Sequence, residues 1–435
     1  MTEPIARRQF LDSMGKALAL GAAAPLWLAS ARGARASVLG VPSASGLSGA
    51  QGDLPGTADT GEAVLGRDPV PAALARDLPS WMQTARVPGL VIAFLQESEL
   101  VGVRAFGVRD AATQDPVRAG TIFEAASLSK VVTAYIALHL VQQGKLALDS
   151  PLVSYAASPC GADQPLAAKI TLRHALTHST GFRNWRFKKD EKLTVDFEPG
   201  TRFSYSGEGI LWVERAIEAA SGAPFARHVQ DALFEPFGMK DSTFVWRSEF
   251  ETTAARGHDN DGQVSESWVM KLARKAHEIG RTKPMPPLDW TYADAEQELI
   301  EAGFPPLPTM VTPNAAGSLF TTAGDYALFF ARVLEKRPRD RASLSDEVRT
   351  AMRSPQIQAA GLVAWGLGVG METDRQPPCV WHWGDSGPAK TFALGDPASG
   401  RAVVVLTNGS RGLRLCERIV QLLMGSGPRA SFLFI

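Results

Sequence analysis

Cysteine is scarce in this chain, and neither sign of charge is in excess. Among 435 residues there are three cysteines, no C-x-x-C pair, and 45 basic against 45 acidic side chains. So few cysteines argue against a disulfide scaffold or a thiolate zinc site, although one bridge could form among them. A net charge of zero without a dense basic tract argues against nucleic acid as a partner. The cysteines are Cys160, Cys379 and Cys416.

Two common hydrolase motifs are also missing. The sequence contains neither the H-E-x-x-H of zinc peptidases nor a G-x-S-x-G nucleophile elbow. His174 and His178 are spaced like metal ligands on a helix, but no third ligand accompanies them. We therefore expect these histidines to pack or to form hydrogen bonds, and we expect no metal or other cofactor.

The first 36 residues have the pattern of an export signal. The pair Arg7-Arg8 precedes a small-residue apolar run from Ala17 to Ala31, and Ala34-Arg35-Ala36 offers a cleavage site. Paired arginines in this context indicate the twin-arginine route, and therefore a periplasmic or otherwise exported protein. A membrane anchor is the alternative, but the run falls short of the roughly 20 residues that a membrane-spanning helix needs.

The remainder reads as a flexible leader at 37–68 followed by one globular domain at 69–430. Strand patterns occur early and late, and helical patterns fill 150–335, where 264–309 has the composition of an insertion. This order predicts an α/β fold of the α+β type, with one antiparallel sheet, flanking helices and a helical lobe. The clearest predicted elements are a helix at 72–85 and strands at 90–95, 101–106, 366–371, 391–394 and 402–406, with a last helix at 411–424.

The strongest catalytic signal is an S-x-x-K sequence at Ser127–Lys130. The same pattern also occurs at Ser13–Lys16 in the export signal, so context has to separate the two. After Lys130 the chain is apolar almost all round a helix as far as Val141, which predicts a buried helix. Ser127 and Lys130 would lie on one face of it, within contact reach. Burial lowers the pKa of a lysine, so a neutral Lys130 could accept the proton of the Ser127 hydroxyl.

These residues resemble a known superfamily. The segment from Glu124 to Lys130 resembles the nucleophile segment of the serine β-lactamases and penicillin-binding proteins. Ser204-Tyr205-Ser206-Gly207 resembles the Tyr-x-Asn motif of class C β-lactamases and of related esterases and D,D-peptidases. His382-Trp383-Gly384 resembles their Lys/His-x-Gly motif. The resemblance spans roughly residues 70 to 425, with further matching pieces in the same order.

The resemblance implies a role for each matching residue. Ser127 would be the acylated nucleophile, while Lys130 and Tyr205 would share the work of base and acid. The backbone N–H groups of Ser127 and Asp385 would form the oxyanion hole. His382 would orient the substrate or tune Tyr205, beside Trp383 and Gly384. The implied activity is that of a serine hydrolase acting on small esters, with a D,D-carboxypeptidase or a β-lactamase as the alternative.

The chain departs from the family pattern at two positions. Gly207 replaces an asparagine that would contact the acylamide side chain of a β-lactam, and the bulky Trp383 could narrow the substrate slot. No S-D-N sequence occurs, so the class A arrangement fits poorly. These departures favour a small-molecule ester as substrate over a β-lactam.

Two further interpretations stay open. Gly384–Pro388 resembles the serine segment of trypsin-like proteases, but no A-A-H-C sequence accompanies it. The chain could also be a non-catalytic penicillin-binding or wall-binding protein, because a fold does not by itself fix a function. Retention of Ser127, Lys130 and Tyr205 favours the enzyme.

Overall fold

The computed structural model describes residues 63–161, 164–425 and 429–435. The export signal predicted at 1–36 lies outside these residues, as does the leader predicted at 37–68 except for its last six positions. Those positions include β1 (Val64–Gly66), whose residues pair with Gly102, Val103 and Arg104. A strand of the sheet therefore lies within the stretch predicted as a leader.

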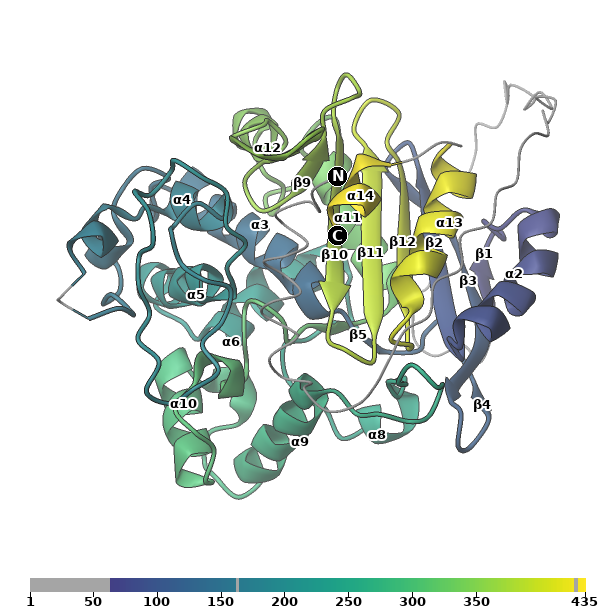
Figure 1. The fold of residues 1–435 in the computed structure, drawn as a ribbon, viewed down its shortest axis with the longest axis horizontal. Coiled ribbons are helices and arrows are strands. Elements are labelled where there is room, and N and C mark those ends of the chain that lie inside the picture. The colour runs from purple at the N-terminus through teal and green to yellow at the C-terminus, as the bar shows by residue number, and fades with distance from the viewer. Residues whose placement is uncertain (1–62, 162–163, 426–428) are drawn as a thin grey trace, which may run out of the picture. The chain divides into compact units, whose positions relative to one another are not determined.

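A large antiparallel sheet forms one side of the described chain (Figure 1). Its strand order is β1-β3-β2-β12-β11-β10-β9-β8-β7, with β4 paired to β3. The last strand, β12, lies between β2 and β11, so strands from both ends of the sequence meet at the centre, as the sequence predicted. The strands are β2 (Gly89–Gln96), β3 (Glu99–Asp110), β4 (Asp115–Pro116), β7 (Ile357–Ala360), β8 (Val363–Trp365), β9 (Gly370–Glu372), β10 (Cys379–Asp385), β11 (Lys390–Asp396) and β12 (Arg401–Thr407).

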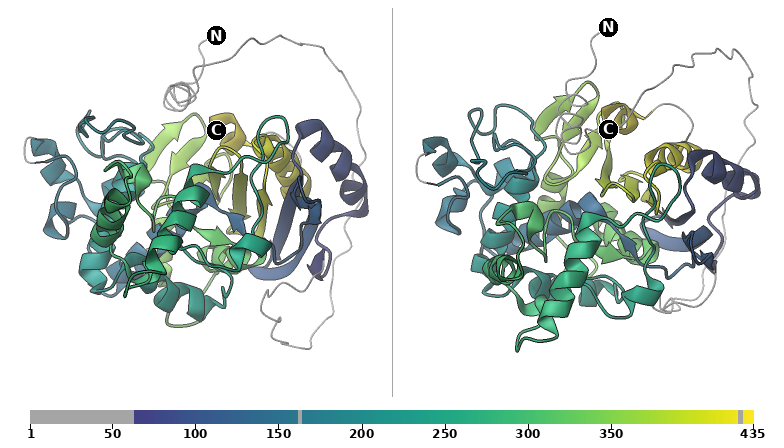
Figure 2. Two further views of the ribbon diagram at one scale, coloured as in Figure 1. Left: turned by 90° about the horizontal axis from the view of Figure 1, so that it is seen from below. Right: turned by 60° about the horizontal axis from the view of Figure 1, so that its bottom comes forward.

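Both faces of the sheet are buried, which explains why its central strands read as unbroken apolar runs. Along β12, Val404 and Leu406 belong to one hydrophobic cluster, while Val403 and Val405 belong to another. Side chains of a strand alternate between its faces, so the two clusters are the two sides of the sheet. Helices α3 (Ser129–Gln142), α5 (Gly207–Ser221) and α11 (Ala323–Leu334) pack in the first cluster, and α2 (Ala72–Ala85) and α13 (Gly412–Met424) in the second. Two further views of the sheet and its helices are given in Figure 2.

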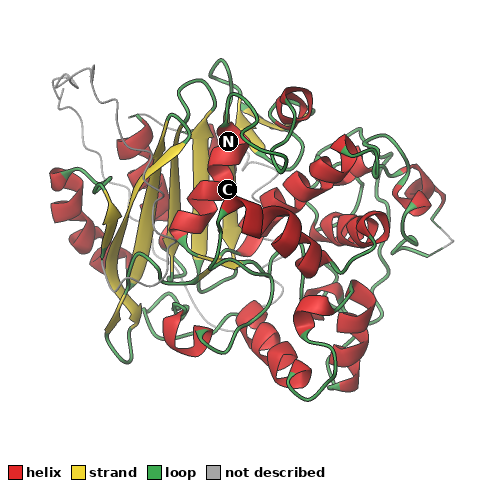
Figure 3. Cartoon of the chain, turned by 180° about the vertical axis from the view of Figure 1, so that it is seen from behind, coloured by secondary structure: helices red, strands yellow, loops and turns green. Residues whose placement is uncertain are grey.

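The helices gather mostly on one side of the strands, where they form the helical lobe (Figure 3). The stretch predicted as an insertion, 264–309, folds as α9, a short turn and α10. A small second sheet pairs β5 (Phe123–Glu124) with β6 (Phe320–Thr321). The helices are α2 (Ala72–Ala85), α3 (Ser129–Gln142), α4 (Leu172–Leu176), α5 (Gly207–Ser221), α6 (Phe225–Val229), α7 (Glu235–Phe237), α8 (Phe250–Thr253), α9 (Trp268–Gly280), α10 (Tyr292–Glu301), α11 (Ala323–Leu334), α12 (Asp346–Met352), α13 (Gly412–Met424) and α14 (Ala430–Phe434).

Short 3₁₀ helices and one π-helical turn connect these elements. They are η1 (Ala126–Leu128), η2 (Leu152–Ser154), η3 (Pro165–Lys169), η5 (Pro287–Asp289) and η6 (Pro308–Met310), and a π-helical turn, η4 (Gln230–Phe234).

The late strands differ from the sequence predictions at two points. The strand predicted at 366–371 is mostly a turn between β8 and β9, closed by a hydrogen bond from Gly366 N–H to the Val369 carbonyl (2.8 Å). Gly368 has a φ of +87° there, and a Cβ atom at this position would overlap Ala134 of α3. The strand β10, which contains the His382–Gly384 motif, was not among the strands predicted from the sequence.

The segment after α13 is fixed to the sheet by a buried ion pair. Arg429 donates to Glu372 (3.0 Å), and the Ser431 hydroxyl donates to the same carboxylate (2.7 Å). This anchor places α14 so that Phe434 packs against Trp365 and Trp383. The segment thus becomes part of the aromatic cluster that borders β10.

The three cysteines are free thiols, and the one disulfide that the sequence allowed does not form. Among the helices of the described residues, none combines the length and apolarity that crossing a membrane would require.

Candidate active site

Ser127 lies in the tight turn η1, directly before the buried helix α3. The preceding residue, Ala126, has a φ of +49°, in the left-handed region that residues other than glycine rarely adopt. The Thr391 hydroxyl of β11 donates to the Ala125 carbonyl (2.9 Å), which ties this turn to the sheet. Ser127 is half-buried, so its hydroxyl stays within reach of a substrate. A strained, anchored turn presenting one serine is typical of a functional position.

Lys130 follows one turn later and is 2% exposed. Its Nζ atom lies 3.0 Å from Ser127 Oγ and donates a hydrogen bond to the Ala316 carbonyl (2.6 Å). Burial lowers the pKa of Lys130 to about 7. A large share of the amine is therefore neutral near pH 7, with its lone pair available to the serine proton. The buried helix and the contact predicted from the sequence are both present.

Tyr205 comes from the loop before α5 and lies beside the same amine. The Lys130 Nζ atom is 5.2 Å from the centre of the Tyr205 ring. Burial raises the pKa of Tyr205, and the nearby Ser127 hydroxyl opposes that shift. The Tyr205 hydroxyl is buried and has no hydrogen bond of good geometry to a described group. Because its pKa is raised, the hydroxyl is protonated near neutral pH, beside the Ser127 hydroxyl.

His178 and His382 flank the Tyr205 ring. The His178 ring centre lies 4.2 Å away, and its Nδ1 atom accepts a hydrogen bond from Ser206 N–H (3.2 Å). The His382 ring centre lies 6.2 Å away, and its Nδ1 atom is 2.8 Å from the Trp383 carbonyl. Burial, reinforced by Lys130, lowers the pKa of His382 to about 3 and that of His178 well below its usual range. Both rings are therefore neutral at physiological pH.

Trp383 and Gly384 occupy the end of β10 next to the nucleophile turn. Trp383 is 5% exposed and packs with Trp381 and Phe434. Most of its side chain is therefore buried among aromatic rings beside Tyr205. A Cβ atom at Gly384 would overlap the Ala125 carbonyl, which explains the glycine at this position. The turn that carries Ser127 therefore lies directly against β10.

Asp385, the last residue of β10, directly follows Gly384. Ser386 N–H donates to the Ala389 carbonyl across the hairpin (3.2 Å), and N–H directions alternate along a strand. Asp385 N–H therefore points to the opposite edge of β10, where pairing with β9 ends at Trp381. Its carboxylate pairs with Lys390. The geometry leaves this N–H directed away from β11, as an oxyanion hole requires.

Gly207 is covered by a side chain that sequence reasoning did not single out, Trp185. A Cβ atom at Gly207 would overlap the Trp185 ring. Asn184 accepts a hydrogen bond from Gly207 N–H (2.9 Å), and Arg186 forms a two-pronged ion pair with the buried Glu208 (2.9 and 3.1 Å). These bonds on both sides hold Trp185 in place, with its ring centre 5.8 Å from Lys130 Nζ.

This arrangement predicts the outcome of restoring asparagine at position 207. Gly207→Asn should destabilise the protein by about 1–3 kcal/mol, because the new side chain overlaps Trp185 in a packed site. Adding Trp185→Ala should recover much of that loss by opening the space. Thermal unfolding of the two single variants and the double variant measures the effect. Additive losses in the double variant would contradict the predicted overlap.

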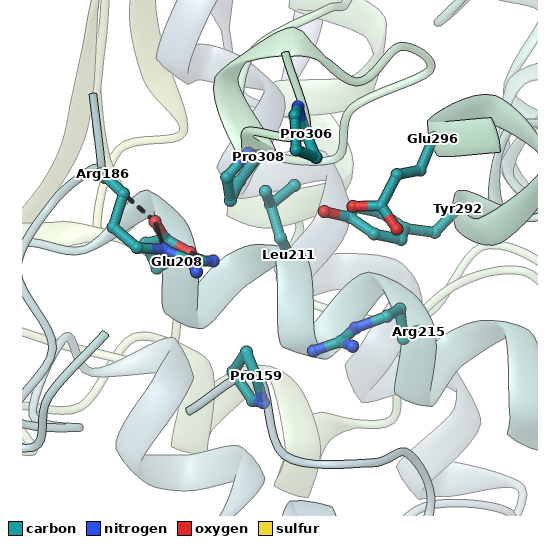
Figure 4. A pocket seen from close by; sticks show the side chains of 9 residues that line it. All are labelled: Pro159, Arg186, Glu208, Leu211, Arg215, Tyr292, Glu296, Pro306 and Pro308. Atoms are coloured by element: carbon teal, nitrogen blue, oxygen red, sulfur yellow. Dashed lines mark hydrogen bonds and ion pairs between the residues drawn. The ribbon is translucent and has the colours of Figure 1, made fainter. Parts of the chain in front are cut away.

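A cavity of about 200 Å³ in the helical lobe is lined in part by the Arg186–Glu208 pair (Figure 4). Its lining includes Arg215 and Tyr292 but none of Ser127, Lys130 or Tyr205. It is separate from the cluster around the serine, and we assign it no part in the chemistry.

The insertion contacts the nucleophile segment through Glu124, another residue given no separate role from the sequence. Ser267, which caps α9, donates to the buried Glu124 carboxyl (2.5 Å). Burial raises the pKa of Glu124 to about 7, with smaller opposing effects from Ser267 and Ser386. Helix α9 is thereby connected to the residues that position Ser127.

The predicted residues Ser127, Lys130, Tyr205, His382, Trp383 and Gly384 thus converge, while Gly207 is shielded by Trp185. In the part of the chain that the structure describes, no group of three acidic, histidine or cysteine side chains could hold a metal. His174 instead accepts a hydrogen bond from Thr171 N–H (3.2 Å) at the start of α4. Nothing in the sequence pattern marked Trp185, since it lies in an irregular loop.

Comparison with known proteins gives one matching family model and several relatives. Residues 74–419 match the family model described as Beta-lactamase. The chain is 30% identical over 209 residues to esterase EstB of Burkholderia gladioli, which covers 41% of this chain and 52% of the esterase. It is 24% identical over 344 residues to penicillin-binding protein 4 of Amycolatopsis lactamdurans, covering 74% and 81%. The match to the esterase therefore spans about half of that protein's length.

Solved structures show the same fold. An octameric penicillin-binding protein homologue from Pyrococcus abyssi superposes with a TM-score of 0.62 at 22% identity, covering 81% of this chain and 77% of the other. A β-lactamase/D-alanine carboxypeptidase from Pseudomonas syringae gives 0.61 at 17% identity, covering 80% and 97%. At these identities the likeness establishes the architecture alone.

Proposed function

Because this chain belongs to the β-lactamase family, we propose that it is a serine hydrolase that cleaves small esters through an acyl-enzyme on Ser127. The observation that carries the proposal is the buried Lys130 amine, 3.0 Å from Ser127 Oγ, with a pKa lowered to about 7. Esterase EstB among the relatives supports the choice of ester over the other acyl compounds of the family.

In the proposed mechanism, Lys130 Nζ takes the hydroxyl proton as Ser127 Oγ attacks the ester carbonyl. The negative charge that develops on the carbonyl oxygen is stabilised by the backbone N–H groups of Ser127 and Asp385. Collapse of this intermediate breaks the bond to the alcohol, which receives a proton from Tyr205 or from the Lys130 ammonium. Water then attacks the acyl group, and the group that protonated the alcohol now accepts a proton from the water. Ser127 is released with its hydroxyl proton restored.

The acidic and basic groups suit these roles because their protonation states differ. Lys130 titrates near neutrality, while Tyr205 stays protonated because burial raises its pKa. Lys130 can therefore accept a proton while the neighbouring Tyr205 hydroxyl still has one to donate. Such paired, opposed states are what general acid–base catalysis needs.

A comparison of three substrate classes tests the proposal. We expect kcat/KM for a short-chain p-nitrophenyl ester to exceed that for a chromogenic cephalosporin by about 100-fold or more. Trp185 fills the space next to Gly207. The acylamide side chain of the cephalosporin therefore lacks a hydrogen-bond partner there, which weakens its binding. Intact-protein mass spectrometry should still detect a slow penicilloyl adduct on Ser127. A D-Ala-D-Ala peptide completes the set.

Each other result of this substrate comparison would support a different function. A cephalosporin kcat/KM above the ester value would make the protein a β-lactamase, and dominant release of D-alanine would make it a carboxypeptidase. Stoichiometric acylation of Ser127 without turnover of any substrate would make it a penicillin-binding protein that lacks hydrolase activity.

We also propose that the protein is exported by the twin-arginine route. Arg7→Lys combined with Arg8→Lys should retain it in the cytoplasm, because a receptor reads the arginine pair. Cell fractionation followed by immunoblotting measures the distribution. An unchanged periplasmic yield would exclude this route.

A further inference from the structure

We propose that this site selects esters whose leaving group carries no negative charge, and that His382 sets this preference. The inference rests on the proposed ester hydrolase function and concerns which esters the enzyme accepts. Its basis is the position and hydrogen bonding of His382 at the end of β10, next to the nucleophile.

The His382 ring is fully buried beside Tyr205 and carries a hydrogen-bond acceptor but no charge. A carbonyl oxygen can only accept, so Nδ1 must carry the proton in its 2.8 Å bond to the Trp383 carbonyl. The other ring nitrogen, Nε2, then holds a lone pair, and it is buried without a hydrogen-bond partner. The ring is enclosed by Trp365 (5.5 Å between centres) and Trp383 (5.3 Å). Adding a proton at Nε2 would place a cation in this aromatic enclosure, which is unfavourable.

The other ionisable groups around the serine carry no fixed charge either. Burial alone accounts for the lowered pKa of Lys130, whereas burial raises the pKa of Tyr205 against a smaller opposing effect of Ser127. No described carboxylate or guanidinium therefore acts appreciably on either group. Lys130 is a cation only when it is protonated, and in that form it cannot act as the base.

Two cations on neighbouring segments, Lys390 and Arg186, are already paired. Lys390 contacts the Asp385 carboxylate and donates to the Gly387 carbonyl (2.8 Å). Arg186 is engaged by Glu208 at two oxygens. A carboxylate on the leaving group would lose its hydration without gaining a partner, whereas an uncharged leaving group could pack on the aromatic wall.

The test uses 4-acetoxybenzoate and 4-acetoxybenzamide, two acetate esters that differ chiefly in the charge of the leaving group. Each kcat/KM is divided by the hydroxide-catalysed rate constant of the same ester to remove intrinsic reactivity. We expect the protein to prefer the amide by at least about tenfold in this ratio, because the carboxylate is desolvated without compensation. His382→Lys should shift the ratio towards the carboxylate by about tenfold, since the carboxylate of the ester supplies the counter-ion that favours the ammonium form of a buried lysine.

His382→Gln is the matched control, because glutamine is uncharged and should leave the ratio close to that of the parent. Fluorophosphonate labelling of Ser127 identifies variants that retain a folded site. Equal normalised values for the two esters in the parent would overturn the inference and leave the ester hydrolase function standing. Failure of the parent to hydrolyse either ester would overturn both.

Discussion

Replacing Ser127 by alanine should lower kcat/KM for a p-nitrophenyl ester by at least about 10⁴-fold and abolish covalent labelling by a fluorophosphonate. The reason is geometric, because Ser127 Oγ is the hydroxyl that lies 3.0 Å from the buried Lys130 amine. Removing the nucleophile eliminates the acyl-enzyme route, and only background hydrolysis remains. Steady-state kinetics and labelling followed by peptide mapping measure the two effects.

Ser386→Ala provides the control for this experiment. Ser386 belongs to the Gly384–Pro388 segment that resembles a protease nucleophile, but its hydroxyl is directed to the Ala389 carbonyl (3.5 Å). The Ser386→Ala protein should still be labelled at Ser127. A labelled peptide containing Ser386 in the parent would show that the nucleophile has been assigned to the wrong residue.

Replacing Lys130 by methionine should lower kcat/KM by about 10³-fold or more, since it removes the group that activates the serine. Methionine has a similar length and suits the apolar surroundings of α3. Because the folded protein no longer has to bury an ammonium group, the variant should melt no lower than the parent at pH 6. A marked loss of thermal stability would show that the lysine is needed for folding. The lower kcat/KM could then not be attributed to the loss of a catalytic base.

The pH dependence of the parent follows from the same amine. Lys130 acts as a base only when neutral, and its pKa is lowered to about 7. Below that pH, kcat/KM should fall about tenfold per pH unit, and above it kcat/KM should level off. Glu124 also has a pKa raised to about 7, so Glu124→Gln is the necessary control. That variant should keep the inflection; its disappearance would assign the titration to Glu124 instead of Lys130.

The parts of the site predicted from the sequence are those that follow from local patterns. The apolar run after Lys130 predicted a buried helix, because a helix that is apolar all round has no face for water. Ser127 and Lys130 are three residues apart, so helical geometry alone brings them together. The resemblance to a family then predicted Tyr205 and the end of β10, which no local pattern connects to Ser127.

The parts that were missed depend on tertiary contacts. Trp185 covers Gly207 because the Arg186–Glu208 ion pair holds an irregular loop against α5, and no periodicity marks such a loop. The turn at Gly366–Val369 looked like a strand because its residues alternate, but close packing against α3 requires a glycine with positive φ at position 368. Phe434 joins the aromatic cluster through a buried ion pair between Arg429 and Glu372, which lie far apart in the sequence.

The position of β12 between β2 and β11 has a consequence for how the protein is made. The ribosome produces β2 early, but the strand that covers its edge is only complete at residue 407. At about 5–20 residues per second, this apolar edge waits on the order of tens of seconds for its partner. A growing chain in that interval is at risk of aggregation and is a natural client for chaperones. It is also catalytically silent, because Ser127 has emerged while the backbone of Asp385 that should face it has not.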